Sequence, residues 1–379
     1  MNVIVFASDH FNTLGVLRCL AEKDIVPTLI LVQDSRKSYL VDSSNCVVKM
    51  IKVGTIPEGY TELLKLLHSS TNNKPVVLTG MDRIQYFLDS KLNELKDKCY
   101  LFNSGVQGRI GELMNKFTQN KIAAECNLNP IQTRIVCNGD FDHSLNYPVL
   151  TKAIDSEQIG WKDMVHICKN EMDLKLAYSQ IDSEKLLLQN YIDKENELAI
   201  MGISYNDGNE ILMPLELKYM RSTEGAYGTY NYLEQFSNEA LKSNIQKFFK
   251  KVKYNGIFEI EFLIDKNKVL WFLEVNFRIS CWVHGYCDCG FNMPYIYAKA
   301  CVDGFLDSSL ISIHKTPFFC LLEPSDFMAH VLGNKDVSLW QWIKDFRNAD
   351  AYYFYDKKDP KPFYKMIYVN LLKVLKCQK

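Results

Sequence analysis

The chain has 379 residues, enough for two or three subdomains around a large hydrophobic core. Its 44 basic and 45 acidic residues give a net charge of -1, so charge offers no reason to expect nucleic acid or an anionic membrane as a partner. The first ten residues, MNVIVFASDH, lack the features of a secretory signal, and no apolar run approaches about 20 residues. We therefore expect a cytoplasmic protein that acts on small molecules, with its 12 cysteines reduced.

The beginning of the chain predicts a small parallel α/β unit. Val3 to Ala7, Thr28 to Val32 and Val76 to Thr79 have the composition of strands, and Leu14 to Lys23 that of a helix. Strands that alternate with helices favour a doubly wound sheet. The turn from Ser8 to Gly15 follows the first strand, where open α/β sheets place ligands. It lacks the G-x-G-x-x-G pattern, so we do not expect a dinucleotide site.

Two runs rich in β-branched and aromatic residues, Ile257 to Ile264 and Val269 to Val275, are joined by the turn Asp265 to Lys268. This pattern predicts a β-hairpin. Because side chains alternate along a strand, acidic or amide residues two apart share a face. Two such pairs occur here: Glu259 with Glu261, and Glu274 with Asn276.

Carboxylates inside apolar strands carry a desolvation cost unless a cation or a hydrogen-bond donor compensates them. In nucleotide sites, Mg²⁺ binds a small number of hard oxygen ligands from the protein and completes its coordination with water and phosphate oxygens. The hairpin therefore predicts an enzyme that uses a magnesium nucleotide. The alternative interpretation is an edge hairpin with solvated acids.

The string Glu274-Val275-Asn276-Phe277-Arg278, with Glu261 on the partner strand, resembles the metal-binding signature of the ATP-grasp ligases. The resemblance implies ATP and Mg²⁺ as cofactors, with Mn²⁺ as a substitute. It implies Glu261, Glu274 and Asn276 as metal ligands. Arg278 would lie close to the phosphates or the acyl phosphate.

The same resemblance implies a set of nucleotide-binding residues. Asn115 and Lys116 open a helix that runs to about Cys126, similar to the family's first nucleotide lysine. Tyr147 to Lys152 resembles the strand that presents a second lysine, although the usual glycine- and serine-rich loop after it is replaced by Ala153 to Trp161. Leu186 to Ile192 resembles the hinge that holds adenine. The implied contacts are Lys116, Lys152, Gln189, Tyr191, Ile192 and, for the ribose, Glu197 in preference to Glu195.

Further residues are implied for the substrate and the reaction. The motif N-x-L-G-x-x-R resembles the pre-ATP-grasp domain of the carbamoyl-phosphate-synthase-like and D-aspartate-ligase-like branch, which implies substrate contacts by Asn12 and Arg18. The alternatives are a helix cap for Asn12 and a solvated helix face for Arg18. Lys218 and Arg221 occupy positions from which related ligases reach the γ-phosphate or the acyl phosphate, so both join Arg278 as expected catalytic residues.

The segment Cys281 to Cys289 contains three thiols and an imidazole, the ligands that zinc prefers. It has no C-x-x-C pair, so we expect these cysteines to pack and not to bind zinc. The following Gly290 to Pro294 resembles the G-x-N-x-P that closes the ATP-grasp core. The aromatic residues of the last part of the chain match no known motif, and we expect them to form a packed extension or a homodimer surface.

These features predict an α/β protein, α+β in its ATP-grasp part. The expected domains are a pre-ATP-grasp sheet domain over residues 1–108, an ATP-grasp domain over 109–305 with a lid at about 131–198, and an extension over 306–379. The resemblance implies a ligase that joins a small carboxylic acid to an amine through an acyl phosphate. Two alternatives stay open: a biotin-carboxylase-like or carbamoyl-phosphate-forming enzyme, and a nucleotide-binding protein without turnover.

Overall fold

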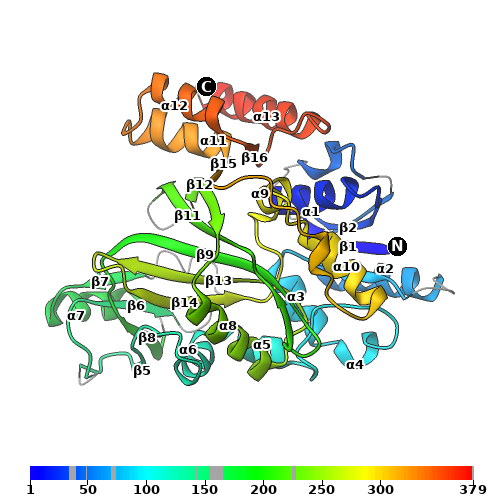
Figure 1. The fold of residues 1–379 in the computed structure, drawn as a ribbon. Coiled ribbons are helices and arrows are strands. Elements are labelled where there is room, and N and C mark those ends of the chain that lie inside the picture. The colour runs from blue at the N-terminus through cyan, green and yellow to red at the C-terminus, as the bar shows by residue number, and fades with distance from the viewer. Residues whose placement is uncertain are drawn as a thin grey trace. The chain divides into compact units, whose positions relative to one another are not determined.

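The computed structural model describes residues 1–33, 40–47, 49–69, 74–141, 144–153, 165–181, 183–223 and 228–377, without the side chains of 152–153 and 370–377. The chain forms two compact units. Figure 1 shows its helices and strands, coloured from the N-terminus to the C-terminus. Unit 1 consists of Met1–Met114, Ala199–Ile260 and Val275–Lys379, and unit 2 of Asn115–Leu198 and Glu261–Glu274. The expected lid at 131–198 falls inside unit 2, whereas the expected C-terminal extension is part of unit 1. No helix of the described ranges is long and apolar enough to cross a membrane.

The N-terminal part of unit 1 contains the predicted parallel sheet, in the order β3-β2-β1-β4. Its strands are β1 (Val3–Ser8), β2 (Thr28–Val32), β3 (Lys49–Val53) and β4 (Val76–Leu78). Its helices are α1 (Phe11–Ala21), the 3₁₀ turn η1 (Val41–Ser43), α2 (Ile56–Ser69), α3 (Asp82–Asp89) and α4 (Leu92–Leu95). The parallel α/β prediction for this region is therefore confirmed.

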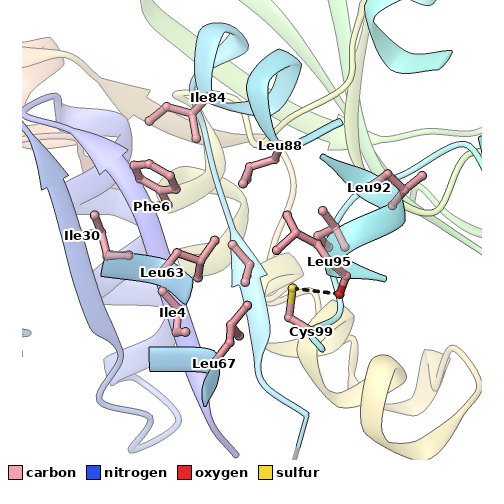
Figure 2. Close-up of a cluster of buried hydrophobic side chains, with 12 residues drawn as sticks. Ile4, Phe6, Ile30, Leu63, Leu67, Ile84, Leu88, Leu92, Leu95 and Cys99 are labelled. Carbon is pink, nitrogen blue, oxygen red and sulfur yellow. Dashed lines mark hydrogen bonds between the residues drawn. The ribbon is translucent and has the colours of Figure 1, made fainter. Parts of the chain in front are cut away.

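Apolar side chains from the sheet and its helices form one buried cluster (Figure 2). Ile4 and Phe6 point from β1 toward Leu63 of α2, and Ile84 and Leu88 come from α3. Burying each such side chain stabilises the fold by about 1.5–3 kcal/mol. This cluster holds β1 and β4 in place, and the turns after these two strands carry residues discussed below.

Unit 2 is built on an antiparallel sheet in the order β5-β8-β6-β7. Its strands are β5 (Thr133–Cys137), β6 (Val149–Ala153), β7 (His166–Cys168) and β8 (Lys185–Asn190), and its helices are α6 (Lys116–Glu125) and α7 (Glu171–Gln180). Val149, Leu174, Leu186 and Leu188 belong to its buried core. This small core supports the strand of Lys152 and the strand that leads to the expected adenine hinge.

The largest sheet follows the order β14-β13-β9-β11-β12-β15-β16, with β10 beside β9. Its strands are β9 (Lys194–Tyr205), β10 (Glu210–Leu212), β11 (Leu215–Ser222), β12 (Gly228–Gln235), β13 (Gly256–Asp265), β14 (Leu270–Asn276), β15 (Phe318–Leu321) and β16 (Ala351–Tyr352). The predicted hairpin is β13 and β14. Its turn is closed by Asp265, whose Oδ1 accepts hydrogen bonds from the backbone N–H groups of Asn267 and Val269.

The remaining helices belong to unit 1. They are α5 (Arg109–Leu113), α8 (Glu239–Val252), α9 (Val283–Asp288), α10 (Met293–Asp303), the 3₁₀ turn η3 (Ser308–Leu310), α11 (Glu323–Asp326), the π-helix η4 (Phe327–Gly333), α12 (Leu339–Asn348) and α13 (Lys361–Cys377). The C-terminal residues extend the large sheet, because β15 pairs with β12 and β16 pairs with β15.

Candidate active site

The chain leaving β14 carries three side chains that meet one buried carboxylate. Glu259 of β13 is only 3% exposed. Its Oε1 accepts a hydrogen bond from Ser280 Oγ at 2.6 Å, and its Oε2 accepts one from Asn276 Nδ2 at 3.1 Å. Arg278 Nη1 lies 3.6 Å from Oε2. The expected metal-binding amide and the expected phosphate arginine are thus joined by a glutamate that the resemblance leaves without a role.

The N-terminal sheet contacts the same segment. Asn12 Nδ2 donates to the carbonyl oxygens of Gly80 and Ile279, each at 2.9 Å, and the N–H of Ile279 donates to the Thr79 carbonyl at 3.2 Å. Asn12 is buried and therefore fixes backbone. It is not the helix cap either, because His10 caps α1. Whether Asn12 also contacts a substrate stays a prediction.

Asp82 begins α3 and approaches Arg278 from the N-terminal part of unit 1. Its Oδ1 lies 3.2 Å from Arg278 Nε. The Asp82 side chain is 56% exposed and that of Arg278 is 17% exposed, so Asp82 can yield to another anion at little cost. Asp82 and Glu259 together hold the guanidinium from two sides.

His10 is a further residue of this region that sequence reasoning missed. Its Nδ1 accepts a hydrogen bond from the backbone N–H of Asn12 at 3.1 Å, so in the neutral ring the proton sits on Nε2. Burial and the nearby Arg278 guanidinium lower the pKa of His10 to about 4. His10 is therefore a neutral hydrogen-bond donor at neutral pH. The sequence did offer one signal for His10, because it follows the end of a parallel strand, where open α/β sheets place ligands.

In unit 2, the expected nucleotide lysine and an expected metal ligand form an ion pair. Lys116 Nζ contacts Glu274 Oε2, with the two side chains 31% and 24% exposed. Lys116 is held at the first position of α6 because Asn115 caps the helix, accepting from the N–H groups of Phe117 and Thr118. A magnesium nucleotide offers both a cation and an anion, so it is chemically suited to take over both partners.

The expected hinge follows β8. Gln189 is buried, and its Nε2 donates to Thr133 Oγ1 at 3.0 Å. The N–H of Tyr191 donates to the Pro148 carbonyl at 3.0 Å. The N–H of Ile192 makes no hydrogen bond within the described part of the chain. Such a donor is suited to a purine edge, which agrees with the role expected for Ile192.

The other expected nucleotide residues are less well defined. Glu197 pairs with Lys194, three residues earlier on β9, whereas Glu195 is more exposed and pairs with Lys268 at 2.5 Å. The backbone of Lys152 is paired with Leu187 in the sheet, which puts the lysine on the predicted strand. Its side chain lies outside the described residues, as do residues 154–161 of the segment that replaces the usual glycine- and serine-rich loop.

Arg18 is not on a solvated helix face. It is 5% exposed, and its Nε lies 3.1 Å from Asp359 Oδ2. Its other nitrogens donate to the carbonyl oxygens of Tyr353, Phe354 and Asp359 at 2.9–3.3 Å. All three nitrogens are used inside the protein, where Arg18 anchors the C-terminal segment, and its expected contact with a substrate stays a prediction.

Arg221 is likewise paired with residues of the C-terminal part. Its Nε and Nη2 donate to the fully buried Asp326, and its Nη1 donates to Asp345 at 2.5 Å. Two carboxylates of the C-terminal residues thus neutralise Arg221, and its catalytic role stays a prediction. Lys218 lies between Glu216 at 2.8 Å and Glu234 at 3.3 Å and is partly exposed, so its catalytic role stays a prediction.

The cysteine-rich segment has separate partners for each group. Cys287 Sγ donates to Glu22 Oε2 at 2.8 Å, and Cys289 Sγ contacts the Lys315 carbonyl at 3.6 Å. His284 Nδ1 lies 3.2 Å from the Tyr352 carbonyl. Among the described residues, no three His, Cys, Asp or Glu side chains are grouped for a metal ion.

The set expected to bind Mg²⁺ is of a different kind, with two carboxylates and one amide. Glu274 and Asn276 share a face of β14, and Glu261 is half-buried on β13. All three offer hard oxygen donors, and Asn276 has its nitrogen turned to Glu259 and its oxygen to the opposite side. The residues therefore fit a magnesium ion by their chemistry.

Comparisons with known proteins agree with this chemistry, although no family model matches the sequence. An N5-carboxyaminoimidazole ribonucleotide synthase of Staphylococcus epidermidis is 24% identical over 314 residues, which cover 81% of this chain and 78% of that enzyme. A D-alanine–D-alanine ligase of Sulfurovum sp. is 24% identical over 297 residues, which cover 68% of this chain and 80% of that ligase.

Solved structures share the fold. The ADP complex of an N5-carboxyaminoimidazole ribonucleotide synthetase has a TM-score of 0.63 at 15% identity, covering 88% of this chain and 85% of that one. An L-amino acid ligase from Bacillus licheniformis has a TM-score of 0.59 at 13% identity, covering 79% and 74%. The fold is therefore that of the ATP-grasp ligases. In sequence, too, the chain is similar to ligases of the ATP-grasp superfamily.

Proposed function

We propose that the protein is an ATP-dependent carboxylate–amine ligase that forms an amide bond through an acyl phosphate. The observation that carries this proposal is the arrangement at the end of β14. There Asn276 and Arg278 are held by the buried Glu259, and Glu274 on the same strand pairs with Lys116. The relatives support it, since two of those described above are by name an amino acid ligase and a D-alanine–D-alanine ligase.

The proposed reaction has two steps. A carboxylate oxygen of the acid attacks the γ-phosphorus of ATP, the bond to the β–γ bridging oxygen breaks, and ADP leaves. The amine then attacks the acyl carbon, phosphate leaves with the bonding pair, and the amine nitrogen loses a proton. Bound Mg²⁺ supplies charge neutralisation to the triphosphate, and Glu261, Glu274 and Asn276 would hold it.

The protein's own groups bind and orient the reactants. Lys116 and Lys152 neutralise phosphate oxygens, and the Ile192 N–H reads the adenine edge. Arg278 stabilises the negative charge that develops on the transferred phosphoryl group or on the acyl phosphate. Because its guanidinium is already fixed by Glu259 and Asp82, little reorganisation is needed when that charge appears.

A bicarbonate-using reaction is the second candidate, favoured by the likeness in fold to a solved biotin carboxylase domain in complex with bicarbonate. ADP release decides between the two. Amino acids, hydroxy acids and sugar acids are assayed singly and in pairs with amines, and bicarbonate is assayed in parallel. The proposal predicts sustained ADP formation that needs both an acid and an amine, because the acid alone carries the reaction only as far as one acyl phosphate per site. ADP formation with bicarbonate alone, and with no acid–amine pair, would support the alternative.

A further inference from the structure

The family signature assigns no role to Glu259 and takes Glu261 as the metal ligand of this strand. Glu259 is nevertheless the more buried of these two glutamates. A carboxylate that is 3% exposed is costly unless its oxygens are paired. The oxygens of Glu259 are paired with the side chains of Asn276, Arg278 and Ser280. These are alternate residues of one short segment, so a single carboxylate contacts every second side chain from Asn276 to Ser280.

We propose that Glu259 is a positioning residue that sets the amide orientation of Asn276 and the place of Arg278, with Ser280 as its support. This inference rests on the proposed function, since it names what prepares the same site. An amide side chain has one donor end and one acceptor end. Since Asn276 Nδ2 faces Glu259 Oε2 at 3.1 Å, Oδ1 is turned the other way, and oxygen is the atom that Mg²⁺ binds.

The substitution Glu259→Gln has a specific consequence. Glutamine keeps the volume but replaces one acceptor oxygen by an N–H₂ donor, while Ser280 still needs an acceptor and takes the remaining oxygen. The new N–H₂ group then faces Asn276 Nδ2, and two donors repel. Rotation of the Asn276 amide relieves this contact and turns its nitrogen to the side where its oxygen was. The variant therefore loses affinity for the cation in particular.

The experiment is calorimetric titration of ATP at a series of Mg²⁺ concentrations, which needs no knowledge of the acid or the amine. In Glu259→Gln we expect the Mg²⁺ concentration for half-maximal enhancement of ATP binding to rise about tenfold or more, as for other groups that orient a metal ligand. ATP binding without Mg²⁺ should change less than twofold. Ser280→Ala, which removes only the support, should shift in the same direction by a smaller factor.

The matched control is Glu323→Gln, because Glu323 is also a buried carboxylate of unit 1, 2% exposed, that accepts from the N–H groups of Phe354 and Tyr355. It should leave the Mg²⁺ dependence unchanged. A Glu259→Gln protein with the parental Mg²⁺ dependence contradicts the inference. So does one that loses ATP affinity equally with and without Mg²⁺, which indicates a purely structural role.

Two outcomes separate this inference from the proposed function. If the parent protein binds MgATP but none of the acid–amine pairs leads to ADP release, the proposed function fails. The calorimetric titration then still tests the role of Glu259. If the parent does not bind MgATP, both fall. Should Glu259→Gln not fold, Ser280→Ala decides, and an unchanged Mg²⁺ dependence in that variant overturns the inference.

Discussion

Lys116 and Glu274 form one ion pair although the family resemblance gives them different tasks, nucleotide binding and metal binding. Both side chains are partly exposed, so their pairing contributes at most about 1 kcal/mol to stability. Their proximity follows from the folded hairpin and from the capped start of α6. The pair therefore matters for the ligand more than for the fold.

Replacing Lys116 by Ala tests this at the residue scale. We expect Lys116→Ala to leave the Tm of the unliganded protein within about 2 °C of the parent, because the pair is weak. The increase in Tm on adding MgATP should be clearly smaller, since a phosphate partner is lost. The control is Lys65→Ala, which removes an exposed pair with Glu62. An undiminished MgATP shift in Lys116→Ala would remove this lysine from the nucleotide site.

Glu323 gives a prediction for pH. Burial raises the pKa of Glu323 to about 7, against backbone N–H donors of Tyr355 and Phe354 that lower it. Between about pH 4.5 and 7, Glu323 therefore keeps its proton in the folded state but loses it in the unfolded chain. The stability that depends on this protonated carboxyl is fully present below about pH 4.5 and is lost as the pH rises through 7. The loss is on the order of 3 kcal/mol for this group. Urea unfolding of the parent and of Glu323→Gln from pH 5 to 8 should show a steeper decline in the parent, and parallel curves would contradict the assignment.

The contacts that sequence reasoning could not predict are those with distant partners. Arg18 has the spacing of a substrate motif, but its carboxylate partner, Asp359, is 341 positions away. Arg221 is likewise paired with residues far along the chain. Spacing along a sequence carries no information about such partners. By contrast, Glu274 and Asn276 share a face because of strand alternation alone, which the sequence does determine.

At the scale of elements, local patterns predicted the hairpin and the parallel sheet well. The hairpin turn is closed by Asp265, a residue whose turn chemistry is visible in the sequence. The first helix begins at Phe11 and not at Leu14, because the His10 side chain caps it, and histidine is not among the strong capping residues. Strand β3 was missed since its lysines, Lys49 and Lys52, are exposed on an edge strand and hide its pattern.

The segment around β16 provides an element-scale prediction. Asp359 is fully buried and accepts from Arg18, from Ser44 Oγ at 2.8 Å and from the Asn45 N–H at 2.7 Å. Asp359→Asn leaves the Arg18 charge buried without its counterion, so we expect a loss of about 3–5 kcal/mol in the free energy of unfolding. Urea denaturation measures it. A loss below about 1 kcal/mol would mean that this segment does not anchor the C-terminal residues.

For the whole molecule, the C-terminal residues behave differently from an appended extension. They supply Asp326 and Asp345 to Arg221 and Asp359 to Arg18, and β15 extends the large sheet. Sequence motifs could not predict this, since the segment resembles no known pattern. Met328, Leu332, Leu339 and Trp340 remain more than half exposed, so a homodimer surface in this region stays a prediction.

Nucleotide preference is a property of the whole protein. Because a ligand that binds the native state stabilises it by mass action, MgATP should raise the Tm and NAD should not. The turn after β1 lacks the glycine pattern of a dinucleotide site, whereas the hinge after β8 offers the Ile192 N–H. Thermal unfolding with each ligand in excess measures this preference. A shift with NAD and none with MgATP would be incompatible with the ATP-grasp assignment of the site.

The central claim is that the hairpin carboxylates serve phosphoryl transfer, and ADP release by Glu274→Gln tests it most directly. The substitution keeps the shape of the side chain and removes one charge. Since that charge is needed as phosphoryl transfer proceeds, kcat should fall on the order of a hundredfold or more, while ATP binding persists in part. The rate is followed with a competent acid and amine across Mg²⁺ concentrations. The account predicts this loss at every concentration, and near-parental ADP release by Glu274→Gln at limiting Mg²⁺ would contradict it.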